Sequence, residues 1–419
     1  MSQGISALNS GTEGGSASGK PLPIVSPEVT GDEELVRELQ AILASRQLTN
    51  GFRVREFEVA AAHYLGVPHC VAVSSCTSGL LLTLRALNLR GEVIVPSFTF
   101  HATVHSIVWN GLTPIFADCD ECTFCVDRDD IAEKVSSRTA AVLAVHMFGC
   151  PAPVNTLQEL CDRRGIPLIF DAAHGFGSKV GARLVGTFGT AEIFSFSPTK
   201  LLVAGEGGLI ATRNARLAEL LRAARNYGDT GNSDPGLLGF NARMSEFHAA
   251  FGLAGFAGLE RRIERRNQIR DIYVRRLQSV PGITFQQVPS GCRSTWKDMS
   301  ILVDERECGI CRDSLREFLS QRNIEARRYF WPPVHRQGLY RGIWDGRALP
   351  VTDRVSNSIL NLPVYSSLAD PDVHRVCDTI VRAVEMARHS RESASRAKSH
   401  AEPATCFPTS VRQTPETMA

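Results

Sequence analysis

The stretch FSFSPTK at residues 194–200, followed by the glycine-rich turn GEGG at 205–208, is the most informative part of the chain. It places Lys200 after a hydroxyl-rich turn and just before a run of glycines. Upstream, an apolar segment at 168–171 reads as a strand that ends in Asp171. A lysine taken alone is most often a solvated surface charge, so the meaning of Lys200 depends on what surrounds it.

Lys200 and Asp171 together indicate a specific chemistry. A lysine amine forms an imine with an aldehyde, and a carboxylate at a strand end holds a pyridine nitrogen protonated. The two groups therefore suit pyridoxal phosphate, and a nearby serine can bind its phosphate.

The composition indicates an ordinary two-domain globular protein. At 419 residues and 43% hydrophobic, the chain is long enough to bury a large core. Its 46 basic and 44 acidic side chains nearly cancel, so overall charge directs it neither to nucleic acid nor to an anionic membrane. No signal peptide and no membrane-spanning apolar run are evident. The 12 cysteines, without secretory features, predict a cytoplasmic protein with free thiols.

The most basic stretch, residues 261–276, has a helical pattern. Leu259, Ile263, Tyr273 and Leu277 recur along it near helical spacing. This favours a solvated helix with one packed face over a nucleic-acid-binding surface.

Two cysteine patterns raise the question of a metal site. Cys119, Cys122 and Cys125 form a CxxCxxC run, and Cys308 with Cys311 forms a CxxC. Zinc or an iron–sulfur cluster uses such spacing. No fourth local ligand is evident, however, and Cys119 closes a strand while Cys311 opens a helix at 312–319. We therefore favour coincidental small thiols and no metal.

Between residues 70 and 212, short apolar strands alternate with helical stretches, which predicts a mostly parallel sheet flanked by helices. Beyond residue 164 the pattern changes, because two strands are joined by the lysine-bearing loop instead of by a helix. The expected strands are 71–75, 93–97, 114–118, 141–146, 168–171, 193–196 and 208–212, and the crossover helices are 77–87, 102–109, 128–135 and 154–164.

Residues suited to ligand binding follow these strands. In parallel sheets, ligands bind beyond the carboxyl ends of the strands, where Asp171 and Phe100 lie. The hydroxyl-rich turn 74–78 leads into a helix whose amino end suits phosphate. Taken alone, that turn is more typical of plain helix N-capping by Ser or Thr.

The turns Pro281-Gly282 and Pro289-Ser290-Gly291 mark the start of a smaller α+β region. We predict a disordered tail at 1–24, a large domain at 25–260 that includes a helix at 33–45, a small C-terminal domain at 261–388 and a disordered tail at 389–419.

The chain resembles the DegT/DnrJ/StrS sugar aminotransferases, pyridoxal-phosphate enzymes of fold type I, over about residues 25–388. No single motif is decisive, but their order and spacing match together. The resemblance implies a large cofactor-binding domain with a mostly parallel sheet and a smaller α+β domain. The matching segments are LTNG at 48–51, VREFE at 54–58, SSCTSGL at 74–80, PSFTF at 96–100, HMFG at 146–149, DAAH at 171–174, the Lys200 segment with its glycine turn, and NARMSE at 241–246.

The resemblance implies a role for each matching residue. Lys200 matches the Schiff-base lysine, whose free amine also moves the proton between substrate and cofactor, and Asp171 matches the carboxylate that pairs with the pyridinium nitrogen. His174 matches the residue that approaches the cofactor's phenolic oxygen. Phe100 matches the aromatic residue that stacks on the ring. Outside this motif, a histidine or phenylalanine is more often a core residue.

Further positions match groups that bind the cofactor's phosphate. Thr77, Ser78 and Ser195 do so within one subunit, and Asn241 matches an asparagine that reaches the phosphate from the other subunit, with Arg243 beside it. The resemblance thus implies a homodimer with shared active sites.

Two positions depart from the family pattern. Cys76 stands where glycine or alanine is usual, and Ala242 stands where an aromatic residue is frequent. Neither removes a catalytic group, but both can reshape the phosphate turn and the subunit boundary. Dehydratase relatives carry histidine in place of the lysine, so Lys200 disfavours that reaction.

The segment YFWPPVH at 329–335 resembles the one that brings a histidine toward the sugar, so we assign Tyr329 and His335 to substrate binding. The expected reaction transfers an amine from glutamate or glutamine to a keto sugar carried on a nucleotide diphosphate. One alternative is a keto-inositol aminotransferase acting on scyllo-inosose. Another is a non-catalytic protein that binds a sugar nucleotide and regulates a pathway.

Overall fold

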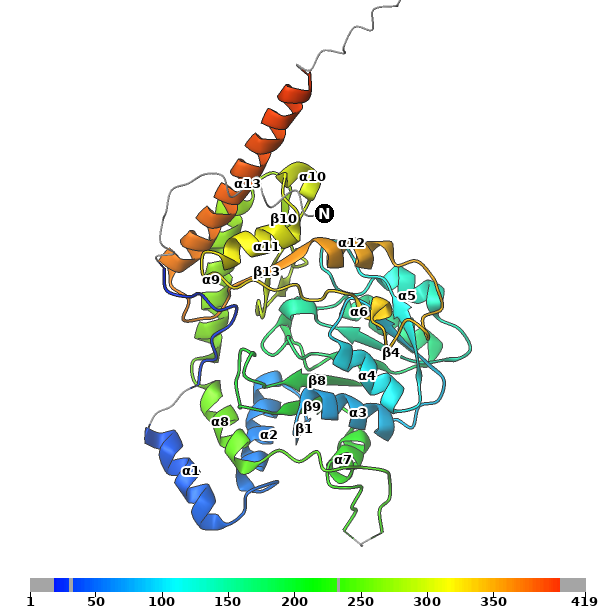
Figure 1. Cartoon of the computed structure of the whole chain (residues 1–419). Coiled ribbons are helices and arrows are strands. Elements are labelled where there is room, and N and C mark those ends of the chain that lie inside the picture. The colour runs from blue at the N-terminus through cyan, green and yellow to red at the C-terminus, as the bar shows by residue number, and fades with distance from the viewer. Residues whose placement is uncertain (1–18, 30–32, 232–233, 400–419) are drawn as a thin grey trace, which may run out of the picture.

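The computed structural model describes residues 19–29, 33–231 and 234–399 (Figure 1). Within these ranges the helices are α1 Glu33–Ser45, α2 Phe52–Leu65, α3 Cys76–Ala86, α4 His101–Trp109, α5 Arg128–Lys134, α6 Val154–Arg164, α7 Ala215–Ala224, α8 Glu246–Phe256, α9 Leu259–Leu277, α10 Glu305–Cys308, α11 Arg312–Ser320, α12 Pro350–Ser358 and α13 Asp370–Ser399. The strands are β1 His69–Val73, β2 Glu92–Pro96, β3 Thr113–Ala117, β4 Thr139–Val145, β5 Leu168–Asp171, β6 Lys179–Val180, β7 Arg183–Leu184, β8 Ala191–Ser195, β9 Gly208–Thr212, β10 Ile283–Phe285, β11 Cys292–Arg293, β12 Met299–Val303 and β13 Ile359–Leu362.

Seven of the described strands form a large sheet in the order β1-β9-β8-β5-β4-β2-β3. β9 runs antiparallel to β1 and β8, whereas the other neighbouring pairs are parallel. The predicted mostly parallel sheet is therefore confirmed. The change of pattern beyond residue 164 also has its reason, because the antiparallel neighbours β8 and β9 need no crossover helix between them. Predicted and observed bounds of these elements differ by a residue or two, as element ends commonly do.

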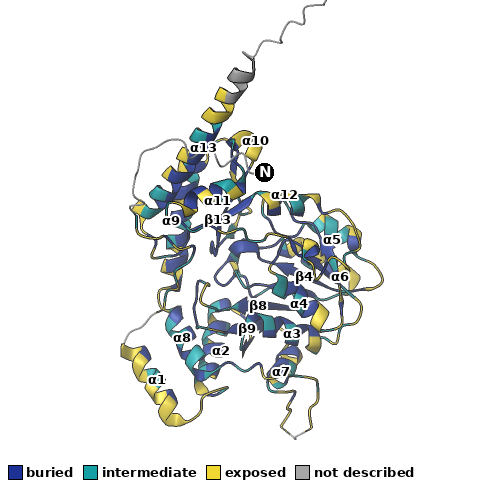
Figure 2. Cartoon of the chain, in the orientation of Figure 1, coloured by how far each residue is buried: buried dark blue, intermediate teal, exposed yellow. Residues whose placement is uncertain are grey.

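The large sheet is buried on both faces, and its strands lie inside the helical layers (Figure 2). In β1, for example, Val71 and Val73 pack in one apolar cluster with side chains of α3, α4 and α7. Cys70 and Ala72, which point the other way, pack with Phe57 of α2. This two-residue alternation is the side-chain period of a strand covered on both sides.

The smaller unit is an antiparallel sheet, β10-β12-β13, packed against α9, α11 and α13. The predicted basic helix is α9, and its apolar residues are buried as expected. Not all of its charges are solvated, however. Arg266 is 3% exposed and donates to the carbonyl oxygen of Trp296, so this part of the helix anchors the start of the small unit.

Both predicted tails prove to be partly folded. Leu22, expected in a disordered segment, is 3% exposed and forms a β-bridge with Ile324. At the other end, α13 continues to Ser399, and Arg391 donates to the carbonyl oxygen of Glu305. At the N-terminal end, apolar contacts of Leu22 with the small unit order a segment whose composition is otherwise polar. At the C-terminal end, the polar residues extend the helix α13. Residues 1–18 and 400–419 lie outside the described ranges.

No helix in the described ranges combines the length and apolarity needed to cross a bilayer. The same residues contain no cluster of three or more histidine, cysteine or carboxylate side chains suited to a metal ion. Cys119 and Cys125 are buried, whereas Cys122 is exposed. Cys311 caps α11 by accepting a hydrogen bond from the Ser314 amide, which explains its position before that helix.

A buried polar cluster ties β4, β5 and β8 together behind the sheet edge. Glu192 of β8 is fully buried and accepts from the amides of Gly186 and Phe188, at 2.7 and 2.6 Å, and from His146 Nε2 at 2.9 Å. Because the Ala152 amide donates to His146 Nδ1, the imidazole proton lies on Nε2. The backbone amide of His146 in turn donates to the carbonyl oxygen of Asp171, which fixes the end of β5.

We expect Glu192→Gln to destabilise the protein by roughly 1–3 kcal/mol. The glutamine oxygen can satisfy the two backbone amides, but its NH₂ group then faces the Nε2–H of His146, so two donors lie opposed. The measurement is the free energy of unfolding from denaturant titration.

Glu219→Gln is the matched control. Glu219 lies on α7, its side chain is 64% exposed, and it pairs with Arg216, so its loss should cost less than about 1 kcal/mol. Equal effects of the two substitutions would contradict the role given to the buried cluster.

Candidate active site

A cavity of about 320 Å³ lies beyond the carboxyl ends of β5 and β8, next to the turn between β1 and α3. It gathers residues from the large sheet edge, the small unit and the N-terminal segment. Seven of the predicted site residues line it: Lys200, Asp171, His174, Ser195, Thr77, Phe100 and Tyr329. Four others do not: Ser78, Asn241, Arg243 and His335.

Asp171, the last residue of β5, is 6% exposed and held by several donors. Thr103 Oγ1 donates to its Oδ2 at 2.7 Å, and the Ala173 amide donates to its Oδ1 at 3.0 Å. The Cys76 thiol lies 3.7 Å from Oδ1, and burial together with the charge of Asp171 raises the pKa of this thiol well above its usual value. Cys76 therefore stays a protonated donor beside the carboxylate.

Lys200 lies in the loop between β8 and β9, on the same cavity as Asp171. Burial and, after it, the positive charge of Lys297 lower the pKa of its amine to about 8, against the opposing effects of Asp298, Cys76 and Asp171. Close to neutral pH the side chain thus has a substantial population of free amine, the form that acts as nucleophile or base.

The glycine turn lets two backbones approach closely. A Cβ atom on Gly208, the first residue of β9, would lie 2.4 Å from the carbonyl carbon of Ser75 in the β1–α3 turn. Gly205 has a φ of 80°, in the left-handed region that glycine adopts without strain. The glycines of GEGG therefore allow the lysine-bearing loop to lie close to the amino end of α3.

The amino end of α3 faces the cavity through Ser75, Cys76 and Thr77. Ser75 caps the helix by accepting from the amide of Ser78, so the capping interpretation of this turn is confirmed. The Ser78 hydroxyl is engaged with those of Ser74 and Ser75, at 2.8 and 2.6 Å. With Ser195 opposite, the turn offers hydroxyls and free helix-end amides, groups that bind an anion such as phosphate.

Aromatic rings and an imidazole form the remaining walls predicted from sequence. The Phe148 amide donates to His174 Nδ1 at 3.3 Å, and the two rings are stacked. Burial and the charges of Lys200 and Lys297 hold the pKa of His174 well below its usual range, so this histidine is neutral. Phe100 and Tyr329 lie at the border between this cavity and a neighbouring groove.

Asn241 and Arg243 lie on the segment between α7 and α8, outside this chain's own cavity. Asn241 is exposed, and Arg243 donates to Asn226 Oδ1 at 2.5 Å and stacks over Tyr227. Ala242 between them is fully buried, and its carbonyl oxygen accepts from the Ser74 amide. The small side chain at this position fits the lack of space between the segment and the sheet.

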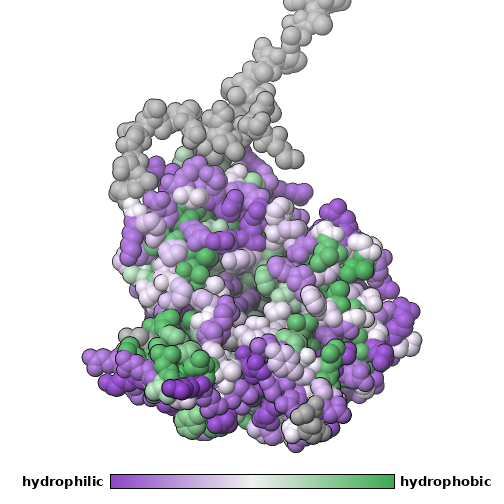
Figure 3. Space-filling model, turned by 60° about the horizontal axis from the view of Figure 1, so that its bottom comes forward, coloured by the Kyte–Doolittle hydropathy of each residue, from purple (hydrophilic) through white to green (hydrophobic). Residues whose placement is uncertain are grey.

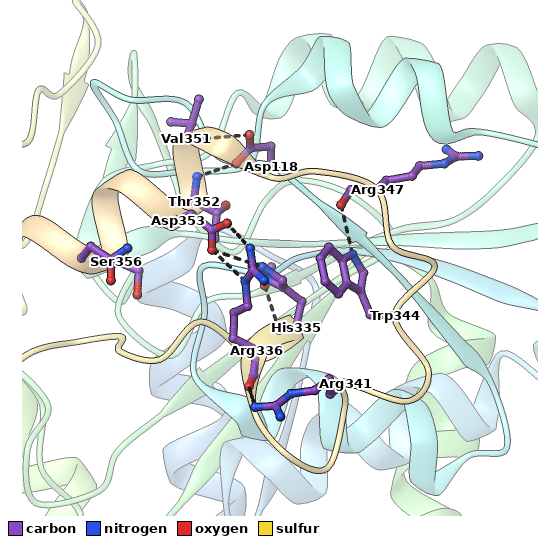
Figure 4. Close-up of polar contacts among 12 residues, drawn as sticks. Asp118, His335, Arg336, Arg341, Trp344, Arg347, Val351, Thr352, Asp353 and Ser356 are labelled. Carbon is purple, nitrogen blue, oxygen red and sulfur yellow. Dashed lines mark hydrogen bonds and ion pairs between the residues drawn. The ribbon is translucent and has the colours of Figure 1, made fainter. Parts of the chain in front are cut away.

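His335 is not brought to the cavity, which corrects the expectation that it faces the substrate. Its side chain is fully buried and lies beside Asp353 and the indole of Trp344 (Figure 4). Ser97 Oγ lies 2.6 Å from Nδ1, and Asp353 lies 3.3 Å from Nε2. The order Ser–His–Asp is that of a hydrolase triad, but Ser97 is fully buried as well, so these residues fix the chain segment to the end of β2.

Sequence reasoning missed the cavity wall supplied by Lys297 and Asp298. These neighbours form an ion pair of 2.8 Å, with side chains 8% and 6% exposed, and Asp298 Oδ2 is buried without a hydrogen-bond partner. Val25 and Ile24 of the N-terminal segment also line the cavity. No motif marks these positions, because an adjacent Lys-Asp pair is usually a surface feature.

Comparisons with known proteins agree with this geometry. A family model of the DegT/DnrJ/EryC1/StrS aminotransferase family matches residues 29–381. The chain is 31% identical over 361 residues to a dTDP-4-amino-4,6-dideoxy-D-glucose transaminase of Escherichia coli, covering 85% of this chain and 97% of that protein. It is also 31% identical over 364 residues to a GDP-perosamine synthase of Vibrio cholerae, covering 86% and 98%.

Among solved structures, DesI in the presence of its TDP-sugar product is similar at a TM-score of 0.85 and 37% identity, covering 92% of this chain and 97% of that one. The family model spans most of the chain, and the relatives are covered almost completely. The fold, the ordered motifs and these matches together show that the chain belongs to the DegT/DnrJ/EryC1/StrS aminotransferase family.

Proposed function

We propose that the protein is a homodimeric, pyridoxal-phosphate-dependent enzyme that transfers an amine from glutamate or glutamine to a keto sugar linked to a nucleotide diphosphate. The observation that carries the proposal is that Lys200, with a pKa of about 8, lines one cavity together with Asp171 and the amino end of α3. These are the groups needed at three different points of one small cofactor.

The cavity residues fit pyridoxal phosphate. Ser75, Thr77 and Ser195 with the α3 amides would hold its phosphate, Asp171 its ring nitrogen, and Lys200 its aldehyde carbon. When bound, the cofactor supplies an aldehyde that takes up an amino group and a protonated ring that accepts electrons. Phe100 and His174 would confine the ring from the sides.

The chain's own residues then perform the proton transfers. Lys200 Nζ is the base and acid at the reacting carbon, because its lowered pKa allows both forms near neutral pH. Asp171 stays oriented through the donors Thr103 and Ala173. Tyr329 and Phe330 close the cavity on the side of the small unit and limit access of water.

The nature of the relatives supports a sugar substrate. Those named above are a dTDP-sugar transaminase, a GDP-sugar synthase and a protein crystallised with a TDP-sugar product. The matches cover nearly the whole length of these relatives, and we therefore assign the same reaction class to this chain.

Two features support a homodimer with shared sites. Asn241 is exposed outside this chain's own cavity, which suits a contact with a partner's site. In addition, α2, α8 and the start of α9 line a surface groove of about 1190 Å³, with Phe52 and Val59 strongly exposed. Figure 3 shows hydrophobic side chains gathered on this side of the molecule. A second copy would cover such a surface.

Lys200→Ala is expected to abolish amino-sugar formation, because it removes the amine that forms the imine and acts as base and acid at the reacting carbon. The assay is mass spectrometry of keto sugar nucleotides and scyllo-inosose, each with glutamate and with glutamine. Circular dichroism tests folding, and Lys179→Ala, at a lysine outside the cavity, is the control. Amination of scyllo-inosose in place of any sugar nucleotide would contradict the proposed substrate class.

In the cofactor-free protein, Lys200 should react with an amine-labelling reagent with a half-point near pH 8 instead of 10.5. Lys297→Met should move this half-point upward, since it removes a neighbouring positive charge, and Asp298→Asn should move it downward. Mass spectrometry of the labelled peptide across pH gives the values. Shifts in the same direction for both variants would refute the electrostatic account.

Mixing Lys200→Ala with Asn241→Ala subunits should restore activity. A mixed dimer has one site with both changes and one site with neither, so random exchange regains up to roughly a quarter of wild-type turnover if sites are shared. Turnover after subunit exchange is compared with each variant alone. No recovery, despite mixed dimers seen by native mass spectrometry, would show that Asn241 serves its own chain's site.

A further inference from the structure

A second hollow of about 350 Å³ adjoins the active-site cavity. The two share Thr99, Phe100, Tyr329 and Phe330 as a common border. Beyond this border, the second hollow is lined by Arg316 of α11 and by the segment 326–332. A molecule that fills the cavity can therefore extend into the second hollow, which we call the arginine groove.

The arginine groove is positively charged. Arg316, Arg327 and Arg328 line it, and its lining includes no aspartate or glutamate. The active-site cavity differs, because there Lys200 and Lys297 are accompanied by three carboxylates, those of Asp171, Asp298 and Glu206. The groove thus offers a site for an anion next to a cavity whose lining has no excess of positive side chains.

The three arginines differ in how free they are. Arg327 forms an ion pair with Glu325. Arg328 lies 3.1 Å from Asp313 and stacks over the Trp331 ring at 4.3 Å, so its guanidinium is oriented but shared. Arg316 forms no ion pair with any residue that the structure describes, and its Nε is buried without a hydrogen-bond partner. A guanidinium with unused donors beside a cavity suits a bidentate oxyanion such as phosphate.

We infer that the arginine groove binds the diphosphate of the sugar nucleotide, with Arg316 as the main anion-binding residue and Arg328 assisting. The inference rests on the proposed function, since a sugar whose carbonyl reaches Lys200 must leave its diphosphate outside the cavity. The shared border of Phe100, Tyr329 and Phe330 is the route by which it reaches the groove. A free cyclitol carries no anion and would leave Arg316 unpaired.

The direct test is calorimetric titration of the holoenzyme with thymidine diphosphate and with uridine diphosphate. Arg316→Gln should weaken binding of the preferred nucleotide by about tenfold or more, and Arg316→Lys, which keeps the charge but not the planar fork, should weaken it less. Added salt should weaken wild-type binding more than that of Arg316→Gln. Arg275→Gln is the matched control, because Arg275 is exposed on α9 and lies outside both hollows.

Kinetics separate this inference from the proposed function. Arg316→Gln should raise KM for the sugar nucleotide with little change in kcat, and should leave the half-reaction with the amino-acid donor unaltered. Absence of nucleotide binding by the wild type, equal binding by Arg316→Gln, or a slowed donor half-reaction would overturn the inference. If Arg316→Gln turns over a sugar nucleotide with unchanged KM, the inference that the groove binds the diphosphate is wrong, but the proposed function stands. If nucleotide binding depends on Arg316 but no sugar nucleotide is turned over, the inference stands and the proposed function is wrong.

Discussion

The strand register that pairs β8 with β5 on one side and with β9 on the other is the constraint on which the site depends. Asp171 lies opposite Ile193, and Ser195 lies opposite Gly208. These pairings bring the carboxylate, the last residue of β8 and the glycine turn to one edge of the sheet, with Lys200 in the loop between them. Because side chains alternate along a strand, a slip of one residue would turn Asp171 and Ser195 to the opposite faces.

Within that frame, burial and neighbouring charges give each group its protonation state. Desolvation and Lys297 act together on Lys200, so its amine is available as a base, whereas Asp298 limits how far its pKa falls. Cys76 shows how a departure from the family pattern is absorbed. Buried beside Asp171, its thiol keeps its proton, and it therefore adds a weak donor to the carboxylate without adding a second negative charge.

Local sequence predicted what depends on local geometry. The strand ends, the lysine loop and the α3 turn follow from residue pattern and turn chemistry, so Lys200, Asp171 and Thr77 could be placed on one edge. Contacts between distant segments could not be predicted in this way. Lys297 reaches the cavity only because the small unit packs against the large sheet, and the histidine at position 335 matches a motif yet is buried against Ser97. In both cases tertiary packing, absent from any local pattern, decides where the side chain lies.

The two hollows draw on different parts of the fold, and this has a consequence for specificity. The groups proposed to perform the chemistry come mainly from the edge of the large sheet, whereas the three arginines of the groove come from α11 and from the segment around Arg328. Substitutions on α11 can alter the anion contact without moving the β5–β8–β9 register. Interactions far from the reacting carbon raise kcat only if they are stronger in the transition state. A diphosphate bound equally tightly in the ground state and the transition state would therefore change KM and not kcat. The value of kcat would then depend on Lys200 and its charged neighbours.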